Sequence, residues 1–215
     1  KIYYNYSVNE PPHFYLENLA GSDITILIMM ELAQAIQMAK EEGLEGIDLL
    51  LRSRKIASQL LENSPFDSDM EYSDDYGSTW KELNDICTEF EESGGATAWF
   101  TLPRDMKFYL RCKSDHHCGP IINSSGDYAI GGNTMSLLYT EDTFRNKTEL
   151  PNKIGETEFG FNFFGMFYNM KSPEMPDINN DGLKDASKLK LPATTLTEGC
   201  YAYMFYNCQH LTNVP

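Results

Sequence analysis

Basic residues, cysteines and long apolar runs are all scarce in this chain. Its 17 Lys and Arg stand against 32 Asp and Glu, which gives a formal net charge of −15. Because phosphate binding needs a basic surface, this balance argues against nucleic acid and anionic membranes as partners. The longest apolar candidate, residues 24–30, has the length of a strand and falls short of the ~20 residues that span a bilayer. The five cysteines are an odd number and too few for a dense disulfide framework.

Aromatic residues are abundant, with 12 Phe and 13 Tyr. They favour a β-rich protein, because aromatic rings suit pleated, half-buried surfaces. Short strand patterns separated by turns occupy much of the first 132 residues, at 14–19, 23–26, 70–73, 79–83, 98–100, 106–110 and 126–132. Strands of this kind predict a small antiparallel β-sandwich.

The segment at about 28–63 has a different period. Its apolar residues recur at three- and four-residue spacing, Gly43 and Gly46 interrupt the pattern, and Ser64-Pro65 ends a second stretch. We therefore expect a helical hairpin inserted into the sandwich. Its apolar stripe either packs on the sandwich, or projects towards a partner through adaptable methionines such as Met29 and Met38.

An internal repeat occupies the last third of the chain. Residues 163–170 match residues 201–208 at a constant offset of 38 residues. Repeats of this kind stack and bury a shared core, because single units cannot fold alone. Cys200 and Cys208 then act as small buried hydrophobes, with a disulfide between them as the alternative.

Residues 191–211, which include Leu191-Pro192, Cys200 and Met204-Phe205, closely resemble one repeat of the BspA-like leucine-rich-repeat surface proteins of bacteria. The resemblance extends over roughly residues 130–215. It implies a secreted or cell-surface protein that binds a ligand, with no chemistry attached and no particular partner.

These features together predict a mainly β protein in two parts. Residues 1–132 form the antiparallel sandwich with its helical insertion, and residues 133–215 form a leucine-rich-repeat solenoid fragment. The last copy is apolar and uncapped where the chain stops at Pro215, so we expect a longer parent array. Since Lys1 opens the chain without an initiator Met, we also expect that an upstream segment, such as an export signal, has been removed.

A polar loop between the copies matches most of a calcium-binding loop. Asp177, Asn179, Asp181 and Asp185 provide alternating oxygen ligands, and a glycine occupies the sixth position. The twelfth position, where a bidentate acid belongs, is Lys188. A calcium site and a simple connecting loop therefore remain alternatives, and no other cofactor is expected.

Two further segments carry a recognisable pattern. Residues 73–80 fit the Asp-box, Ser-x-Asp-x-Gly-x-Thr-Trp, in which Asp75 caps a hairpin turn and Trp80 packs behind it. The segment from Cys112 to Cys118, with His116 and His117 between them, permits a disulfide, two free thiols or a metal site.

The chain lacks a nucleophile–base signature, a phosphate-binding loop and a His-Glu-x-x-His motif, so we do not expect an enzyme. We expect a binding or adhesion module, extracellular or on a bacterial surface, that presents its repeats to a protein or glycan ligand. Tyr168, Tyr206 and His210 are the candidate ligand contacts, with core packing as the alternative. Another candidate role is a structural component of a larger assembly, such as a phage fibre, that docks through the helical hairpin.

Overall fold

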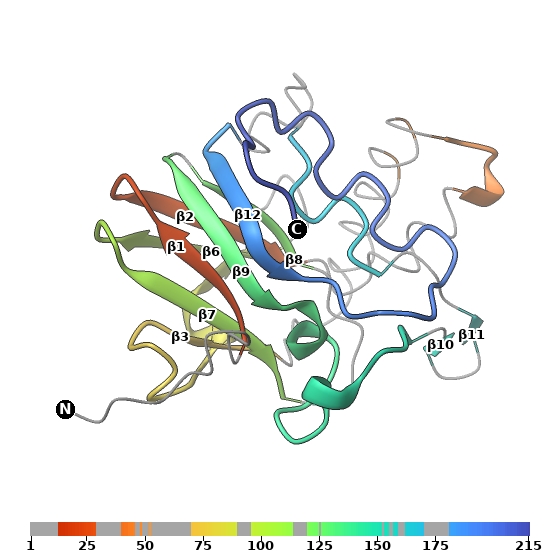
Figure 1. Ribbon diagram of the computed structural model, residues 1–215, viewed down its shortest axis with the longest axis horizontal. Helices are drawn as coiled ribbons and strands as arrows, with labels where there is room; N and C mark the ends of the chain where they lie inside the picture. The colour runs from red at the N-terminus through yellow and green to blue at the C-terminus, as the bar shows by residue number, and fades with distance from the viewer. Residues whose placement is uncertain are drawn as a thin grey trace.

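A computed structural model of the chain describes residues 13–28, 40–45, 48, 52, 70–89, 96–113, 120–124, 126–151, 153–154, 157–158, 162–169 and 181–215. These residues form a mainly β structure with two larger sheets and a two-stranded ribbon (Figure 1). The six-stranded sheet has the order β12 (Leu183–Lys190), β9 (Tyr128–Asn133), β1 (Phe14–Asn18), β7 (Lys107–Cys112), β3 (Met70–Ser73) and β4 (Lys81–Glu82).

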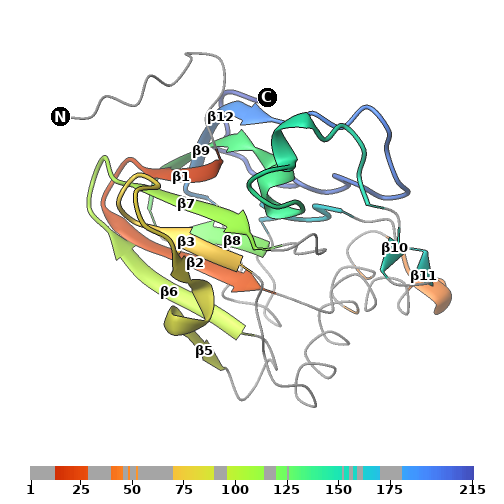
Figure 2. The same ribbon diagram turned by 90° about the horizontal axis from the view of Figure 1, so that it is seen from below.

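The four-stranded sheet has the order β5 (Cys87–Glu89), β6 (Ala96–Leu102), β2 (Ser22–Ile28) and β8 (Pro120–Ser124). The ribbon pairs β10 (Lys153–Ile154) with β11 (Thr157–Glu158), and it lies apart from both sheets in Figures 1 and 2. Three short 3₁₀ helices complete the described elements: η1 (Leu83–Ile86), η2 (Thr134–Leu137) and η3 (Phe144–Asn146).

The chain passes between the two larger sheets at the corner after β1. Asn18, the last residue of β1, is fully buried, and its side-chain oxygen accepts hydrogen bonds from the amides of Ala20 and Gly21 at 3.2 and 3.0 Å. The Asn18 amide donates to the carbonyl of Met106, and the Asp105 amide donates to the carbonyl of Asn18. This asparagine therefore joins the corner between β1 and β2 to the corner between β6 and β7.

Strand β12 pairs with β9 in parallel, whereas the other pairings of the six-stranded sheet are antiparallel. At this place β9 also approaches the chain before β1 very closely. Gly132 has φ +94°, and a Cβ atom added to it would lie 1.7 Å from the carbonyl oxygen of His13. Only glycine fits this contact, because it has no Cβ atom and tolerates positive φ.

One hydrophobic core is shared by the sheets and the repeat region. Its buried members include Leu16 and Phe108 of the six-stranded sheet, Leu102 and Ile122 of the four-stranded sheet, and Phe167 and Met204 of the two repeat copies. Burial of side chains of this size contributes roughly 1.5–3 kcal/mol each relative to exposure. The repeat copies are therefore part of the same packed interior as the sheets.

The fold class expected from the sequence is corrected by this architecture. The main sheet is mixed and not antiparallel, because β12, from the region assigned to a leucine-rich-repeat solenoid, is hydrogen-bonded into it. Among the described residues no helix reaches seven residues, and no helical hairpin is seen at about 28–63, although most of that segment lies outside the described residues.

Strand β12 was missed because its buried residues do not alternate. Leu183, Ala186 and Leu189 are buried at a spacing of three residues, a pattern that also fits a loop of the repeat array. The spacing arises because the register against β9 shifts between Leu183 and Asp185 and again between Asp185 and Lys188. Irregularities of this kind turn a strand and change which side chains face the core.

The division of the chain into residues 1–132 and 133–215 stays a prediction, and β9 and β12 pair directly across it. Over the described residues, the structure contains no helix with the length and apolar character that crossing a membrane requires.

We predict that Gly132→Ala lowers the free energy of unfolding by about 3 kcal/mol or more, because the new Cβ atom meets the backbone of His13. Gly43→Ala is the matched control. Gly43 also has positive φ, +79°, but nothing lies within 4 Å of an added Cβ atom, so its loss should be about 1 kcal/mol. Urea denaturation of both variants measures the difference, and equal losses would contradict the close approach.

Candidate functional site

The two repeat copies lie side by side as neighbouring layers (Figure 1). Alternate amides of the inner copy, residues 162–169, donate to carbonyl groups of the outer copy, residues 199–208. The bonds run from Gly165 to Ala202 at 2.9 Å, from Phe167 to Met204 at 2.9 Å and from Asn169 to Tyr206 at 3.0 Å. The hydrogen bonds hold the two backbones in one fixed register.

Aromatic side chains at equivalent positions stack across the two copies. Phe163 lies over Tyr201 with ring centroids 5.5 Å apart, Phe167 over Phe205 at 5.6 Å, and Tyr168 over Tyr206 at 5.1 Å. The last two pairs are inclined by only 7°. The stacking predicted from the 38-residue offset is therefore confirmed at these three positions.

A reciprocal pair of asparagines completes the ladder. The side-chain amide of Asn169 donates to the backbone carbonyl of Asn207 at 3.1 Å, and that of Asn207 donates to the carbonyl of Asn169 at 3.2 Å. Asn169 is only 1% exposed, so a shift of register would leave a buried amide without a partner. The asparagines thus stabilise this register of the two copies relative to shifted registers.

Both copies use the same left-handed turn. Phe163 and Tyr201 have φ near +60°, and so do Gly165 and Tyr203, at 60° and 56°. The turn is closed alike in the two copies, by a 3.0 Å bond from the Tyr168 amide to Gly165 and another from Tyr206 to Tyr203. Tyr203 was not singled out from the sequence, although aligning the copies position by position places it opposite Gly165.

Two of the three candidate ligand contacts are exposed. Tyr206 is 43% exposed and His210 is exposed, whereas Tyr168 is only 2% exposed beneath Tyr206. Burial raises the pKa of Tyr168 to about 12, so its hydroxyl stays protonated at neutral pH. Tyr168 supports the exposed ring and does not itself reach the surface.

The candidate calcium ligands are only partly described. Asp181 accepts a hydrogen bond from the Asn169 side chain at 2.8 Å, and Asp185 accepts one from the Ser187 amide at 2.7 Å. Asp177 and Asn179 lie outside the described residues. Within the ranges that are described, no group of three or more His, Cys, Asp or Glu is arranged to hold a metal ion, and the calcium loop stays a prediction.

Three cysteines, Cys112, Cys200 and Cys208, are free thiols. Cys112 is buried and forms no disulfide, while Cys118, His116 and His117 lie outside the described residues. Cys200 and Cys208 are also free, and the Cys208 thiol donates to the carbonyl of Phe167 at 3.0 Å. Burial raises the pKa of Cys208 to about 12, which keeps it a thiol and makes it a poor nucleophile.

The Asp-box forms a capped hairpin turn. The Asp75 carboxylate accepts hydrogen bonds from the amide and hydroxyl of Thr79 at 2.8 and 2.7 Å, and from the Ser73 hydroxyl at 2.7 Å. Because these bonds favour the charged form, led by that from the Thr79 hydroxyl, the pKa of Asp75 falls to about 2. The pattern acts as a structural turn, as its residues indicate.

Trp80, at the end of the Asp-box, packs between two side chains. The Arg111 guanidinium lies 4.0 Å from its ring centroid, and the His13 ring meets it edge-on at 4.8 Å. This contact joins the hairpin to the start of β1.

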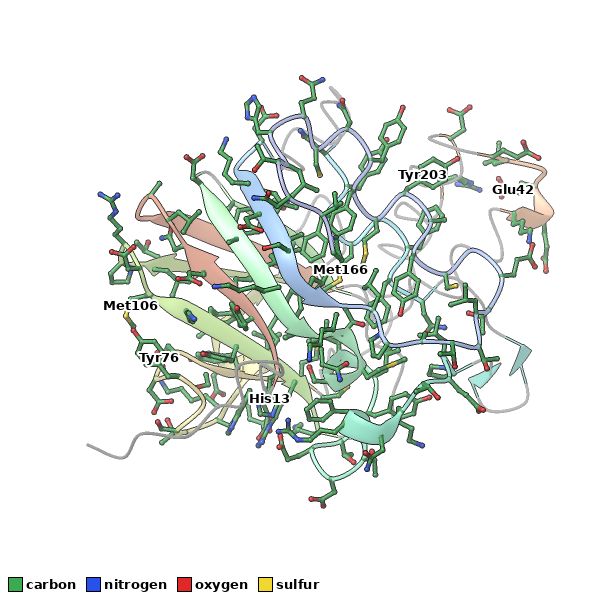
Figure 3. The ribbon with its side chains drawn as sticks, viewed as in Figure 1. His13, Glu42, Tyr76, Met106, Met166 and Tyr203 are labelled. Carbon is green, nitrogen blue, oxygen red and sulfur yellow. The ribbon has the colours of Figure 1, made fainter. Side chains whose placement is uncertain are left out.

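His13 is the buried centre of a charged cluster. Its Nε2 atom contacts Glu141, which also pairs with Arg111 at 3.5 Å and with Arg145 at 3.1 Å. Desolvation lowers the pKa of His13, although the hydrogen bond and charge of Glu141 oppose this shift. Figure 3 places His13 well apart from Tyr203, so the cluster is separate from the outer copy.

We predict that Asp75→Asn lowers the free energy of unfolding at pH 7 by about 1–2 kcal/mol, because hydrogen bonds to a charged acceptor are lost. The pKa of Asp75 in the folded protein lies below the ordinary value of 3.8, so the stability from the charge is present above pH 3.8 and is lost as the pH falls through about 2. Denaturation curves at several pH values test this. Asp74→Asn, which removes only an exposed pair with Lys81, should cost under about 1 kcal/mol.

We predict that His13 makes the protein less stable in mild acid. Its folded pKa is lowered below 6.5, so its stabilising contribution is complete above pH 6.5 and declines as the pH falls below that value. The unfolding free energy of His13→Gln should therefore change less between pH 7.5 and 5.5 than that of the wild type. His210→Gln, at an exposed site, is the control; identical pH profiles for His13→Gln and the wild type would contradict the prediction.

Comparison of the chain with protein-family models, with curated protein sequences and with solved structures gives no significant match. The resemblance of residues 130–215 to BspA-like surface proteins therefore remains an interpretation of the sequence. The candidate site is consequently defined by its geometry, with the outer copy as its centre.

Proposed function

We propose that this chain is a non-enzymatic binding module that presents the outer repeat copy to a protein or glycan ligand, outside the cell or on its surface. The exposed, rigidly held ring of Tyr206 is the observation that carries this proposal. The resemblance to bacterial surface proteins supports the same class of function and the same location.

The ring of Tyr206 is fixed before any ligand arrives. The ring stacks on that of Tyr168, with centroids 5.1 Å apart and an interplanar angle of 7°. The backbone of Tyr206 is also held, because its carbonyl accepts a hydrogen bond from the Asn169 amide and its amide donates one to the Tyr203 carbonyl. An aromatic ring held in this way loses little conformational entropy on binding. Tyrosine is also among the residues that most often dominate binding energy at interfaces.

The assembly role through a helical hairpin is set aside, because that hairpin belonged to the fold class that the structure corrects. The outer copy supplies a surface that does not depend on it.

We predict that Tyr206→Ala weakens ligand binding at least about tenfold, the loss expected from removing an aromatic anchor. The probe is a panel of immobilised secreted glycoproteins, including mucin, with binding followed by surface plasmon resonance. Tyr76→Ala is the matched control, since Tyr76 is 48% exposed and lies in the Asp-box turn.

Circular dichroism of both variants confirms that they remain folded. The proposal fails if the wild-type chain binds nothing on the panel, or if both variants bind as well as the wild type.

A further inference from the structure

We infer that the outer copy binds a neutral carbohydrate, and that Tyr203 forms the contact surface together with Tyr206. This inference rests on the proposed function and names the ligand class of the same site. Four observations lead to it: the backbone at Tyr203, the geometry of the two rings, the lack of charged residues in the outer segment itself and the amide groups beside the rings.

Tyr203 has a left-handed backbone conformation at a position of the turn where the other repeat copy has glycine. Its φ is 56°, and the equivalent residue of the inner copy, Gly165, has φ 60°. Left-handed φ is strained for a tyrosine and is relaxed for glycine. The outer copy thus carries a ring where the same turn is built without one, and strain of this kind concentrates at binding sites.

The two outer tyrosines meet at an angle. The rings of Tyr203 and Tyr206 have centroids 5.6 Å apart and are inclined by 63°. Tyr203 is held from below by Phe164, whose ring lies 5.4 Å away, and Tyr206 by Tyr168. Tyr206 is exposed and Tyr203 is half-buried, so the two supported rings offer differently oriented aromatic surfaces of unequal exposure; Figure 3 labels Tyr203.

The segment that carries the two rings has no charged residue of its own, and Lys184 and Asp181 contact it at His210. Residues 199–215 contain no Asp, Glu, Lys or Arg, in a chain with a net charge of −15. Acidic glycans and phosphorylated ligands are recognised through Arg and Lys, which this segment does not contain. The composition of the outer copy therefore favours an uncharged ligand.

Neutral amides adjoin the exposed ring. Asn207 follows Tyr206 directly, and its side-chain oxygen accepts a hydrogen bond from the Gln209 side chain at 2.9 Å. Both residues are exposed. Side-chain amides carry a donor and an acceptor on one group.

A neutral sugar matches this combination of groups. One face of a pyranose ring exposes C–H groups, which are apolar and pack on an aromatic ring, while its rim carries hydroxyls that donate and accept hydrogen bonds. The tyrosines supply the aromatic surface and the amides supply the uncharged partners.

The test uses the full 215-residue chain and a microarray that carries neutral oligosaccharides of glucose, galactose, mannose and N-acetylglucosamine beside sialylated and sulfated glycans. We expect binding to neutral spots only. The neutral oligosaccharide with the strongest signal is then titrated calorimetrically against the wild type, Tyr203→Gly and Tyr76→Gly.

Tyr203→Gly should weaken the affinity at least about tenfold while the protein stays folded, because glycine is relaxed at this φ. Tyr76→Gly is the matched control: it makes the same change at a φ of 62°, in the Asp-box turn well apart from Tyr203 (Figure 3), and should leave the affinity unchanged. Tyr203→Phe should retain most of the affinity, because the ring is kept.

Three results would overturn the inference: binding to acidic glycans alone, no binding to any glycan, or equal affinity of the wild type and Tyr203→Gly. Repeating the glycoprotein panel after enzymatic deglycosylation separates this failure from failure of the proposed function. Tyr206-dependent binding that survives deglycosylation leaves the binding module intact with a protein ligand. If the wild-type chain binds none of the untreated glycoproteins, both the proposed function and the carbohydrate inference are wrong.

Discussion

Parallel pairing between β9 and β12 is the constraint on which the rest of the structure depends. The residues between these strands leave the sheet and return to it, and the inner repeat copy lies on that excursion. The outer copy follows β12, and the chain then comes back beside the same strand, where Asn213 bridges Asp185 in parallel. The copies are held side by side by the hydrogen bonds between them, such as that from the Gly165 amide to the Ala202 carbonyl.

Some of this architecture was accessible from the sequence. The short strands, the Asp-box turn and the repeat offset are local or translational patterns, and each predicted a real feature. The mixed sheet was not accessible, since a parallel partner is distant in the chain and the two register shifts of β12 remove its alternation. The free state of Cys112 was equally hidden, because two cysteines at short spacing fit a disulfide as readily as a buried thiol.

Only part of the candidate site could be predicted, because the sequence shows residue types but not which side chains the fold buries. Tyr206 and His210 were identified by residue type, but Tyr168 has the same type and an opposite environment, which only the stacking order decides. Tyr203 is a candidate because its φ is positive, and the sequence indicates this only when the two copies are aligned so that Tyr203 matches Gly165. The stacking of rings and the reciprocal asparagines together make this surface rigid, so its recognition properties belong to the copy as a unit.

The stacked rings also have a consequence for substitutions. The two copies meet different environments, because residues 162–169 are buried whereas Tyr206 and Asn207 of the outer copy are exposed. A substitution in the inner segment alters the interior packing, whereas the corresponding change in the outer segment alters the outward chemistry. A change at Tyr206 should therefore disturb the core less than the same change at its buried counterpart Tyr168.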